Sequence, residues 1–432
     1  MSAYAARRNE LLETLQHGVV VLPAAPLFLR NNDVEHEYRQ DSDFYYLTGF
    51  DEPESVCVLT TEHPKHRFVL FVRPRDPDRE VWDGPRAGVD GAMERFGADA
   101  AYPISELRQR LPDYLQNHEK LVYRFGRDRS FDETILDTID ATRARGRTGS
   151  TWPTTIVDPS TLIHEMRLIK TEAELEIMRK AAAITKEAHI GAMRLSRPGL
   201  YEYEVEALYR EVFRKRGAER SAYAPIVGSG PNATILHYRS NDRLMNDGDL
   251  LLVDAGCEFG YYASDVTRTW PVNGKFTKEQ RAIYEIVLDA QKASIEKVKP
   301  GATLDDVHRA SVETIVDGLL KLGLLSGDRQ KIIDEQLFKP FYMHKTSHWL
   351  GMDVHDVGFY FRDKKPRPLE PGMVLTIEPG IYISASNDTV ASEWRGIGVR
   401  IEDDIVVTEN GYENLTGDIP REVEDVERAC KS

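Results

Sequence analysis

The sequence predicts an α+β protein of two domains, and three observations lead to this prediction. The chain has 432 residues, which is long for one hydrophobic core. In its first part, short apolar runs rich in β-branched and aromatic residues alternate with helical patterns. Two pairs of capped helices follow, about a hundred residues apart, and each leads into strands. We expect an α/β domain over residues 1–165 and a domain of two similar α-α-β halves over 166–432.

The first domain should contain a sheet, because four apolar runs bounded by Gly, Pro or charged clusters are typical of β-strands. The runs are 19–23, 43–50, 55–61 and 67–74. Polar, proline-bearing sequence at 150–160 then indicates the boundary between the domains.

Capping signals place the first helix pair. Thr171 with Glu174 forms a capping box that opens an amphipathic helix reaching about residue 194. A second helix over 201–217 can end at its last residue, a glycine.

The second helix pair repeats this arrangement. Thr277 with Gln280 caps a helix to about Val298, and another helix runs from Leu304 to near Gly323. Such a repeat predicts two halves packed face to face with a site between them. Chance similarity of the two helix pairs is the alternative explanation.

Two acids stand inside apolar strands in LLVDAGCEFGYYASDVTRTW, residues 251–270. A hairpin that turns at Phe259-Gly260 would place Asp254 opposite Asp265, with Cβ atoms about 4.5–5.5 Å apart. Like charges at that separation destabilise a sheet unless a cation lies between them, and a metal pair about 3.5–4 Å apart fits there. The alternative is that both acids are solvated on an open face.

Two later strands carry further acids. Glu378 follows an apolar run in VLTIEPGIYI, and Glu402 shares a strand face with Arg400 in VRIEDDIVV. Converging ionised carboxylates are costly to bury, and two divalent ions would neutralise four of them. The sequence therefore predicts a dinuclear metal site.

HKTSHWLGMDVHDVG contains His344, His348 and His355. A single histidine beside apolar residues is more often a core or surface residue than a ligand, but three of them close to the acidic strands favour a ligand. One imidazole with four carboxylates suits Mn²⁺ better than a structural Zn²⁺. Apart from His237 and the three histidines of this stretch, the chain has eight histidines, and we interpret these eight as surface residues.

Composition excludes several other classes. The net charge of −15 argues against binding to nucleic acid or to an anionic membrane. The three cysteines form no CxxC pair, so neither a disulfide framework nor a thiolate metal site is indicated. The N-terminal residues lack the apolar stretch of a signal peptide, and the apolar run at 19–29 is too short to span a bilayer. We expect a cytoplasmic enzyme.

Together these segments resemble the pita-bread metallopeptidase family, and within it the bacterial Xaa-Pro aminopeptidases (aminopeptidase P). The segments that carry the resemblance are YRQDSDFYYLTGFDEPES, HEMRLIKTEAEL, APIVGSGPNATILHY, LLVDAGCEFGYYASDVTRTWPVNGKFT, HKTSHWLGMDVHDVG, LEPGMVLTIEPGIYI and RGIGVRIEDDIVV. The resemblance implies a C-terminal pita-bread catalytic domain over 166–432, preceded by a creatinase-like N-terminal α/β domain.

The resemblance also implies a ligand set. Asp254 would chelate one of two divalent ions, expected to be Mn²⁺, whereas His348 and Glu378 would hold the other. Asp265 and Glu402 would bridge the pair.

Further roles follow from the same resemblance. A water or hydroxide that bridges the metals would attack the carbonyl before proline, with Glu378 as proton acceptor. His237 and His355 match positions that contact the substrate and stabilise the tetrahedral intermediate. His344 would line the proline pocket. Arg400 and Tyr382 would orient the ligands.

The expected substrates are peptides with proline at position two, and the expected assembly is a homo-oligomer, either a dimer or a tetramer. The N-terminal domain would restrict access and support assembly, with Trp82 in a segment that can reach a neighbouring subunit's site. One residue departs from the family pattern. Lys345 stands where the bacterial enzymes usually carry a small residue, and it could alter substrate reach beside the proline pocket.

Three alternatives remain at this point. A prolidase, which cleaves only Xaa-Pro dipeptides, would share all five ligands, although YRQDSDFYYLTGF and DAGCEFGYYASD match the aminopeptidases better. A pita-bread binding module without metal is disfavoured because all five positions can bind metal. A metal-free creatinase-type hydrolase is disfavoured for the same reason.

Overall fold

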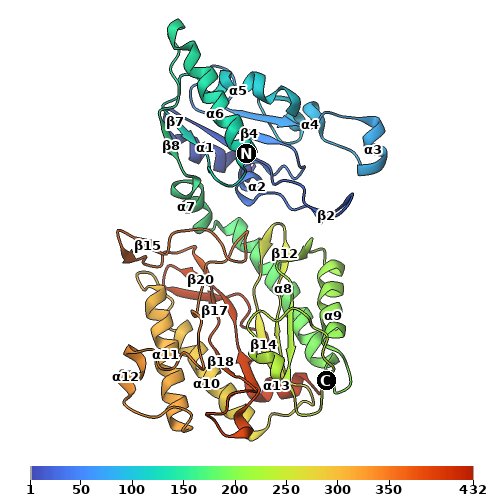
Figure 1. Ribbon diagram of the computed structural model, residues 1–432, viewed down its shortest axis with the longest axis vertical. Helices are drawn as coiled ribbons and strands as arrows, with labels where there is room; N and C mark the ends of the chain where they lie inside the picture. Colours follow the sequence, from blue (N-terminus) through green and yellow to red (C-terminus); the bar gives the residue numbers. More distant parts are fainter. Residues whose placement is uncertain (1, 432) are drawn as a thin grey trace. The chain divides into compact units, whose positions relative to one another are not determined.

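The computed structural model describes residues 2–431 and divides into two compact units, Met1–Arg167 and Leu168–Ser432 (Figure 1). This division falls two residues after the boundary expected at 165/166. Each unit has its own hydrophobic core.

The N-terminal unit is built around a mixed six-stranded sheet. In spatial order its strands are β6 (Ala100–Pro103), β5 (Phe68–Val72), β4 (Val56–Thr60), β1 (Gly18–Pro23), β7 (Lys120–Val122) and β8 (Thr155–Val157). Strand β4 pairs antiparallel with β1 and β5, whereas the outer pairings are parallel. The other elements of the unit are α1 (Ala3–Leu15), β2 (Leu29–Asn31), β3 (Val34–Glu35), α2 (Ser42–Thr48), α3 (Pro77–Asp83), α4 (Gly88–Glu94), α5 (Leu107–Leu115) and α6 (Arg129–Ala144), with α7 (Ile163–Leu168) at its end.

The run at 43–50 was expected to be a strand, and the structure corrects this to the helix α2. Asp41 caps the helix by accepting a hydrogen bond from the backbone N–H of Phe44 at 2.8 Å. Gly49 ends it in the left-handed region at φ 67°. Its aromatic residues favour a strand by intrinsic preference, but the two caps and the burial of Phe44 and Tyr46 outweigh that preference.

The C-terminal unit contains both expected helix pairs. They are α8 (Glu172–Leu195) with α9 (Glu202–Lys215), and α10 (Lys278–Ile295) with α11 (Leu304–Lys321). The capping boxes expected before α8 and α10 are both formed. Figure 1 shows α8 and α9 on one side of the central strands and α10 and α11 on the other.

The central strands form two matching hairpins. The first joins β11 (Leu250–Asp254) and β12 (Cys257–Phe259) to β13 (Tyr262–Ala263) and β14 (Thr267–Pro271). The second joins β17 (Val374–Ile377) and β18 (Gly380–Ile383) to β19 (Ile397–Arg400) and β20 (Asp403–Thr408). The remaining elements are β9 (Arg220–Ser221), β10 (Ile226–Ser229), α12 (Arg329–Asp334), β15 (Phe361–Arg362), β16 (Lys365–Pro366), β21 (Gly411–Asn414) and α13 (Val423–Ala429).

The register of the first hairpin differs from the expected one. The chain turns at Gly260 and Tyr261, with φ 57° and 68°, so Asp254 pairs with Thr267 and not with Asp265. Side chains alternate with a period of two, and a two-residue shift therefore keeps Asp265 on the same face as Asp254. The expected direct pairing is wrong, but the shared face is retained.

Each long strand expected from the sequence is interrupted close to an acid. The first hairpin breaks between β11 and β12, just after Asp254, and between β13 and β14, around Asp265. The second breaks at Glu378-Pro379 and at Ile401-Glu402. Proline cannot donate a ladder hydrogen bond, which explains the third break. At the fourth break the N–H of Glu402 donates to the Thr267 carbonyl at 3.0 Å, and this bond joins the two hairpins.

Histidines outside the expected site are not all at the surface. His118 and His189 are buried, which contradicts the surface interpretation. His189 accepts from the hydroxyl of Tyr209 through Nδ1 at 2.8 Å and donates from Nε2 to the carbonyl of Ala255 at 3.2 Å. These partners satisfy both ring nitrogens, so the histidine can be buried without charge.

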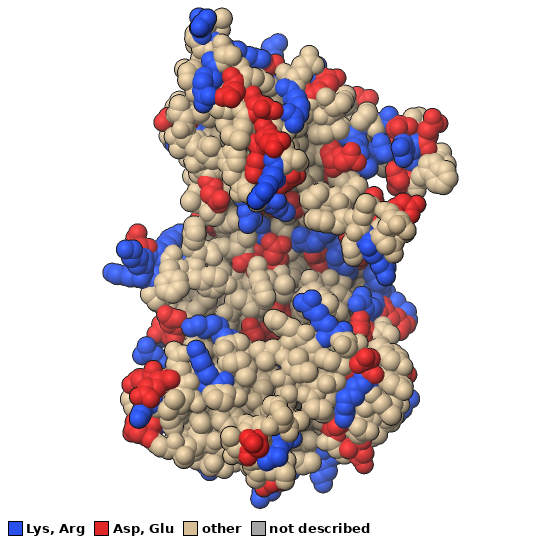
Figure 2. Space-filling view, in the orientation of Figure 1, with Lys and Arg blue, Asp and Glu red and all other residues tan. Residues whose placement is uncertain are grey.

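Within residues 2–431, no helix combines the length and the apolar content that a membrane crossing requires. On the face drawn in Figure 2, acidic and basic side chains are interspersed in each unit.

Candidate metal centre

Asp254 and Asp265 meet at one tyrosine hydroxyl. Tyr223 Oη lies 2.6 Å from Asp254 Oδ1 and 2.5 Å from Asp265 Oδ1. Both aspartates are buried, with 9% and 5% of their surface exposed. The end of β11 and the break before β14 thus direct two carboxylates to one point.

The second hairpin and the histidine segment contribute the other donors. Nε2 of His348 lies 3.4 Å from Asp265 Oδ2 and 3.6 Å from Glu378 Oε1. Ligand atoms of Asp265, His348 and Glu402 all lie within 4.8 Å of one another. His348 Nδ1 donates to the carbonyl of Trp349 at 2.9 Å, which leaves Nε2 free to act as a ligand.

The acids repel one another at this point. Burial and the neighbouring carboxylates raise the pKa of Glu402 well above its usual value. Burial also raises the pKa of Glu378 to about 7, although His348 and Arg400 oppose this. For Asp254, burial outweighs the attraction of Arg400 and its pKa also rises. Divalent cations would remove this repulsion, so the donor set of carboxylates and one imidazole fits hard metal ions.

Hydrogen bonds made by Arg400 hold the Asp254 carboxylate in position. Arg400, at the end of β19, donates through Nη2 to Asp254 Oδ2 at 2.7 Å and through Nη1 to the Tyr382 hydroxyl at 2.9 Å. Its Nε donates to Thr267 Oγ1 at 3.0 Å, and that hydroxyl donates to Glu402 Oε2 at 2.6 Å. One guanidinium thus connects acids from both hairpins.

The remaining three histidines surround this cluster. Nε2 of His344 lies 2.9 Å from the Tyr382 hydroxyl, and its Nδ1 lies 3.8 Å from Glu378 Oε2. The rings of His348 and His355 are edge to face at 4.4 Å between centroids. Burial lowers the pKa of both His344 and His355, and the charge of His237, which is exposed, adds to this effect.

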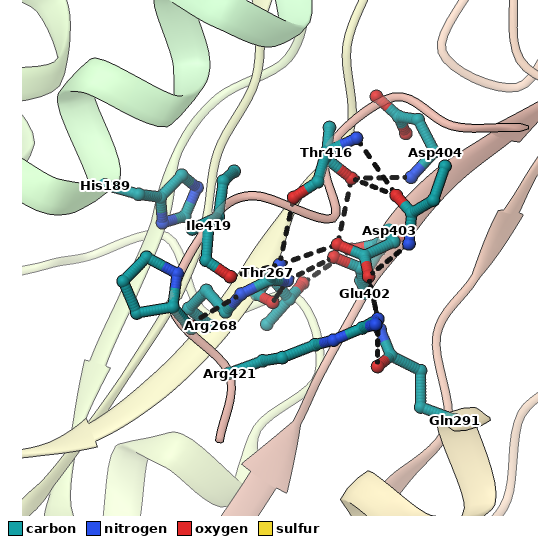
Figure 3. Close-up of polar contacts among 12 residues, drawn as sticks. His189, Thr267, Arg268, Gln291, Glu402, Asp403, Asp404, Thr416, Ile419 and Arg421 are labelled. Atoms are coloured by element: carbon teal, nitrogen blue, oxygen red, sulfur yellow. Dashed lines mark hydrogen bonds and ion pairs between the residues drawn. The ribbon is translucent and has the colours of Figure 1, made fainter. Parts of the chain in front are cut away.

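The structure adds residues that the sequence did not identify. Arg268, on β14 and completely buried, donates through Nη1 to the carbonyl of Glu402 and through Nη2 to Asp403 Oδ1, each at 2.6 Å (Figure 3). Asp404 Oδ2 accepts from the backbone N–H of Asp265 at 3.1 Å. These contacts fix the backbone of Glu402 and Asp265. In the sequence, the only hint of these contacts was the run of three acids that follows Ile401, residues 402–404.

Asp403 is itself enclosed by donors. It accepts from Arg421, Gln291 and Asn414 through Oδ2, and from Thr416 through Oδ1 (Figure 3). Burial opposes the charge, but Arg268 and Arg421 outweigh it and lower the pKa of Asp403 to about 2. Asp403 is therefore an ionised structural anion.

Two family models match this chain. The model described as Metallopeptidase family M24 matches residues 176–409, and the model described as Aminopeptidase P, N-terminal domain, matches residues 4–123. The Xaa-Pro aminopeptidase of Escherichia coli (strain K12) is 46% identical over 423 residues, which cover 98% of this chain and 96% of the relative.

Solved structures agree with the family models. Pseudomonas aeruginosa aminopeptidase PepP matches with a TM-score of 0.97 at 50% identity, covering 99% of this chain and 97% of that chain. Zn-substituted Escherichia coli aminopeptidase P in complex with product matches with a TM-score of 0.96 at 44% identity, covering 100% of this chain and 98% of that chain. The expected resemblance and the expected pita-bread fold are confirmed, and the chain belongs to metallopeptidase family M24.

Proposed function

We propose that the chain is a metal-dependent Xaa-Pro aminopeptidase, which releases the N-terminal residue from peptides with proline at position two. The observation that carries this proposal is the convergence of five metal-competent side chains, from two hairpins and the histidine segment. The relatives of the chain include proteins named Xaa-Pro aminopeptidase. The names of these relatives favour the aminopeptidase over a prolidase.

The ligand assignment rests on proximity and on the donor types. Asp254 would hold one divalent ion, and His348 with Glu378 would hold the other. Asp265 and Glu402 would bridge the pair, consistent with the position of Asp265 between Tyr223 and His348. Manganese is the proposed metal because the set is rich in oxygen donors. When bound, the ions would lower the pKa of water and polarise the scissile carbonyl.

Glu378 is the proposed proton acceptor. Without bound metal, burial raises the pKa of this carboxyl group to about 7, and the neighbouring acids add to this effect. Bound cations would lower that pKa, so Glu378 would be a carboxylate that can accept a proton. Substrate would meet His237 and His355 beside the acids, and burial keeps the pKa of His355 below its usual value. A neutral His355 can donate one hydrogen bond to a developing oxyanion.

His344 is proposed to line the proline pocket, and Tyr382 and Arg400 are proposed to orient it and the metal ligands. The Tyr382 hydroxyl lies 2.9 Å from His344 Nε2 and 2.9 Å from Arg400 Nη1. Burial and the charge of Arg400 lower the pKa of His344 to about 4. A neutral imidazole presents its ring face without a charge, which suits the apolar proline ring.

The N-terminal unit is proposed to restrict access and to support a homo-oligomer, as a dimer or a tetramer, in the cytoplasm. Val81 and Trp82, both on α3, have 82% and 84% of their surface exposed. Large exposed apolar side chains favour a partner surface. Light scattering coupled to size exclusion tests this: a Trp82→Ser variant should shift towards monomer if α3 contributes to assembly.

Paired peptides test the activity. We expect the Mn²⁺-loaded protein to cleave an Xaa-Pro-Yaa tripeptide and chelator-treated protein to lose that activity. Cleavage of the Xaa-Pro dipeptide alone would identify a prolidase. Cleavage of neither peptide by metal-loaded protein would contradict the proposed substrate class.

A further inference from the structure

A cavity of about 490 Å³ adjoins the proposed proline pocket. The first turns of α11 line it with Asp305, His308 and Arg309. The segment after α12 lines it with Lys339, Tyr342, His344 and Lys345. His344 faces both spaces, because its imidazole also lies beside Tyr382 and Glu378.

The charge of this cavity is opposite to that of the chain. Arg309, Lys339 and Lys345 contribute three positive charges, and Asp305 contributes one negative charge. The whole chain carries −15. All three cations are exposed, and none has a hydrogen-bonded or ion-paired side-chain partner within residues 2–431. Their charges are therefore available to a ligand.

Hydrogen bonds join His308 and Tyr342, which both line the cavity, to the buried Thr346. His308 Nδ1 contacts Thr346 Oγ1 at 2.8 Å, and the Tyr342 hydroxyl contacts the same oxygen at 2.6 Å. Burial, together with the charges of Lys345 and Lys339, lowers the pKa of His308 to about 4. His308 is thus neutral at pH 7, and the lysines supply the positive charge of the cavity.

We propose that this cavity is an anion subsite that binds a carboxylate of the peptide beyond its proline, with Lys345 and Lys339 as the specificity-determining residues. The inference rests on the proposed function, which places proline beside His344. An extended peptide advances about 3.3–3.6 Å per residue, so the residue that follows proline can reach this cavity, which shares His344 with the proposed proline pocket. Both a C-terminal carboxylate and an acidic side chain have the required chemistry.

Three peptides, compared in two pairs, distinguish these two sources with the Mn²⁺-loaded enzyme. Ala-Pro-Gln with a free C-terminus and its amide differ only in the C-terminal carboxylate. The amides of Ala-Pro-Glu and Ala-Pro-Gln differ only in the side-chain carboxylate. At low salt we expect at least one of the two pairs to show a roughly fivefold preference in kcat/KM for the anionic peptide, near the upper limit for an exposed ion pair. The preference should decrease as salt increases.

The Lys339→Gln/Lys345→Gln double variant should reduce that preference to about one, mainly through KM, because a binding contact is removed. Both lysines are exposed, so the fold should tolerate the change. Lys321→Gln is the matched control: it removes an exposed lysine from the far end of α11 and should keep the preference.

The outcomes separate the two proposals. If the wild type cleaves none of the peptides, the proposed function fails. If it cleaves the neutral amide but shows no preference for either anionic peptide, the subsite is wrong. The subsite is equally wrong if the double variant keeps the wild-type preference.

Discussion

Arg268 donates through Nη1 to the backbone carbonyl of Glu402 at 2.6 Å, while its Nη2 donates to Asp403 Oδ1 at the same distance. Both the guanidinium and the Asp403 carboxylate have 0% of their side-chain surface exposed. The first hairpin thus holds the break in the second hairpin at the position where Glu402 leaves the ladder. Arg268 therefore positions Glu402, the proposed bridging acid, in two ways: it binds the backbone carbonyl of Glu402, and it forms a buried ion pair with the neighbouring Asp403.

Arg268→Lys tests this positioning. An ammonium cannot reproduce the fork that reaches both oxygens, so metal affinity should fall by about 10- to 100-fold, as for other groups that orient ligands. The free energy of unfolding should fall by up to about 3–5 kcal/mol, because a buried carboxylate loses part of its partner. Competition with a metallochromic chelator measures the affinity, and urea unfolding measures the stability.

Arg421→Lys is the control for Arg268. Arg421 donates to the other oxygen of Asp403 at 2.6 Å, and its side chain is 23% exposed. The Arg421→Lys variant should lower the free energy of unfolding less than Arg268→Lys does, and its metal affinity should stay close to that of the wild type. Equal losses of metal affinity in the two variants would assign Arg268 a general structural role.

Tyr223→Phe tests the contact between the two aspartates. The hydroxyl can donate to only one carboxylate at a time, and its removal leaves the two acids without that partner. We expect metal affinity to fall by about tenfold while the fold is retained. Isothermal titration with Mn²⁺ checks this, and an unchanged affinity would mean that the hydroxyl contributes nothing to the metal-bound state.

Asp265→Ala or Glu402→Ala should abolish activity and metal retention together, because each acid is proposed to hold both ions. His355→Ala should instead lower turnover more than metal content. Elemental analysis of dialysed protein beside kcat distinguishes the two classes. Loss of metal in His355→Ala to the same degree would make this histidine a ligand, and full activity of either acid variant would refute the bridging assignment.

His189 predicts a pH dependence of stability. Burial and the charge of Arg268 lower its pKa to about 3, whereas a histidine in the unfolded chain titrates near 6.5. Between these values only the unfolded chain binds the proton, so the free energy of unfolding decreases as pH falls. From pH 7 to 5 this contribution is about 2 kcal/mol.

Urea unfolding of wild type and His189→Gln at pH 7 and pH 5 tests this. The glutamine variant does not titrate, so it should lose about 2 kcal/mol less than wild type between the two pH values. A parallel loss in both proteins would show that His189 is not the group responsible.

Local sequence signals predicted where helices begin better than they predicted the strand register of the first hairpin. Capping boxes at Thr171 and Thr277 depend on residues three positions apart, so both helix starts were predictable. The hairpin turn was misplaced because Tyr261 adopts φ 68°, a conformation that a bulky residue rarely takes. Residues 42–48 form a helix because Asp41 and Gly49 cap the aromatic sequence between them.

The acids that converge at the candidate site could be predicted from the sequence, but the residues that hold these acids in position could not. Acids in apolar strands are detectable because an unpaired buried charge is costly. The pairing of Arg268 with Asp403 spans 135 residues and depends on how the two hairpins meet, which no local pattern specifies. Tyr223 was missed for the same reason, since it lies 31 residues from Asp254.

The central claim is that two metal ions share Asp265 and Glu402. The most direct test is a crystal structure of the Mn²⁺-loaded protein with anomalous diffraction recorded at the manganese edge. We predict two anomalous peaks, with oxygens of Asp265 and Glu402 bound to both, Asp254 bound to one, and His348 with Glu378 bound to the other. A single peak at full occupancy under saturating Mn²⁺, or two peaks without a shared carboxylate, would contradict the account.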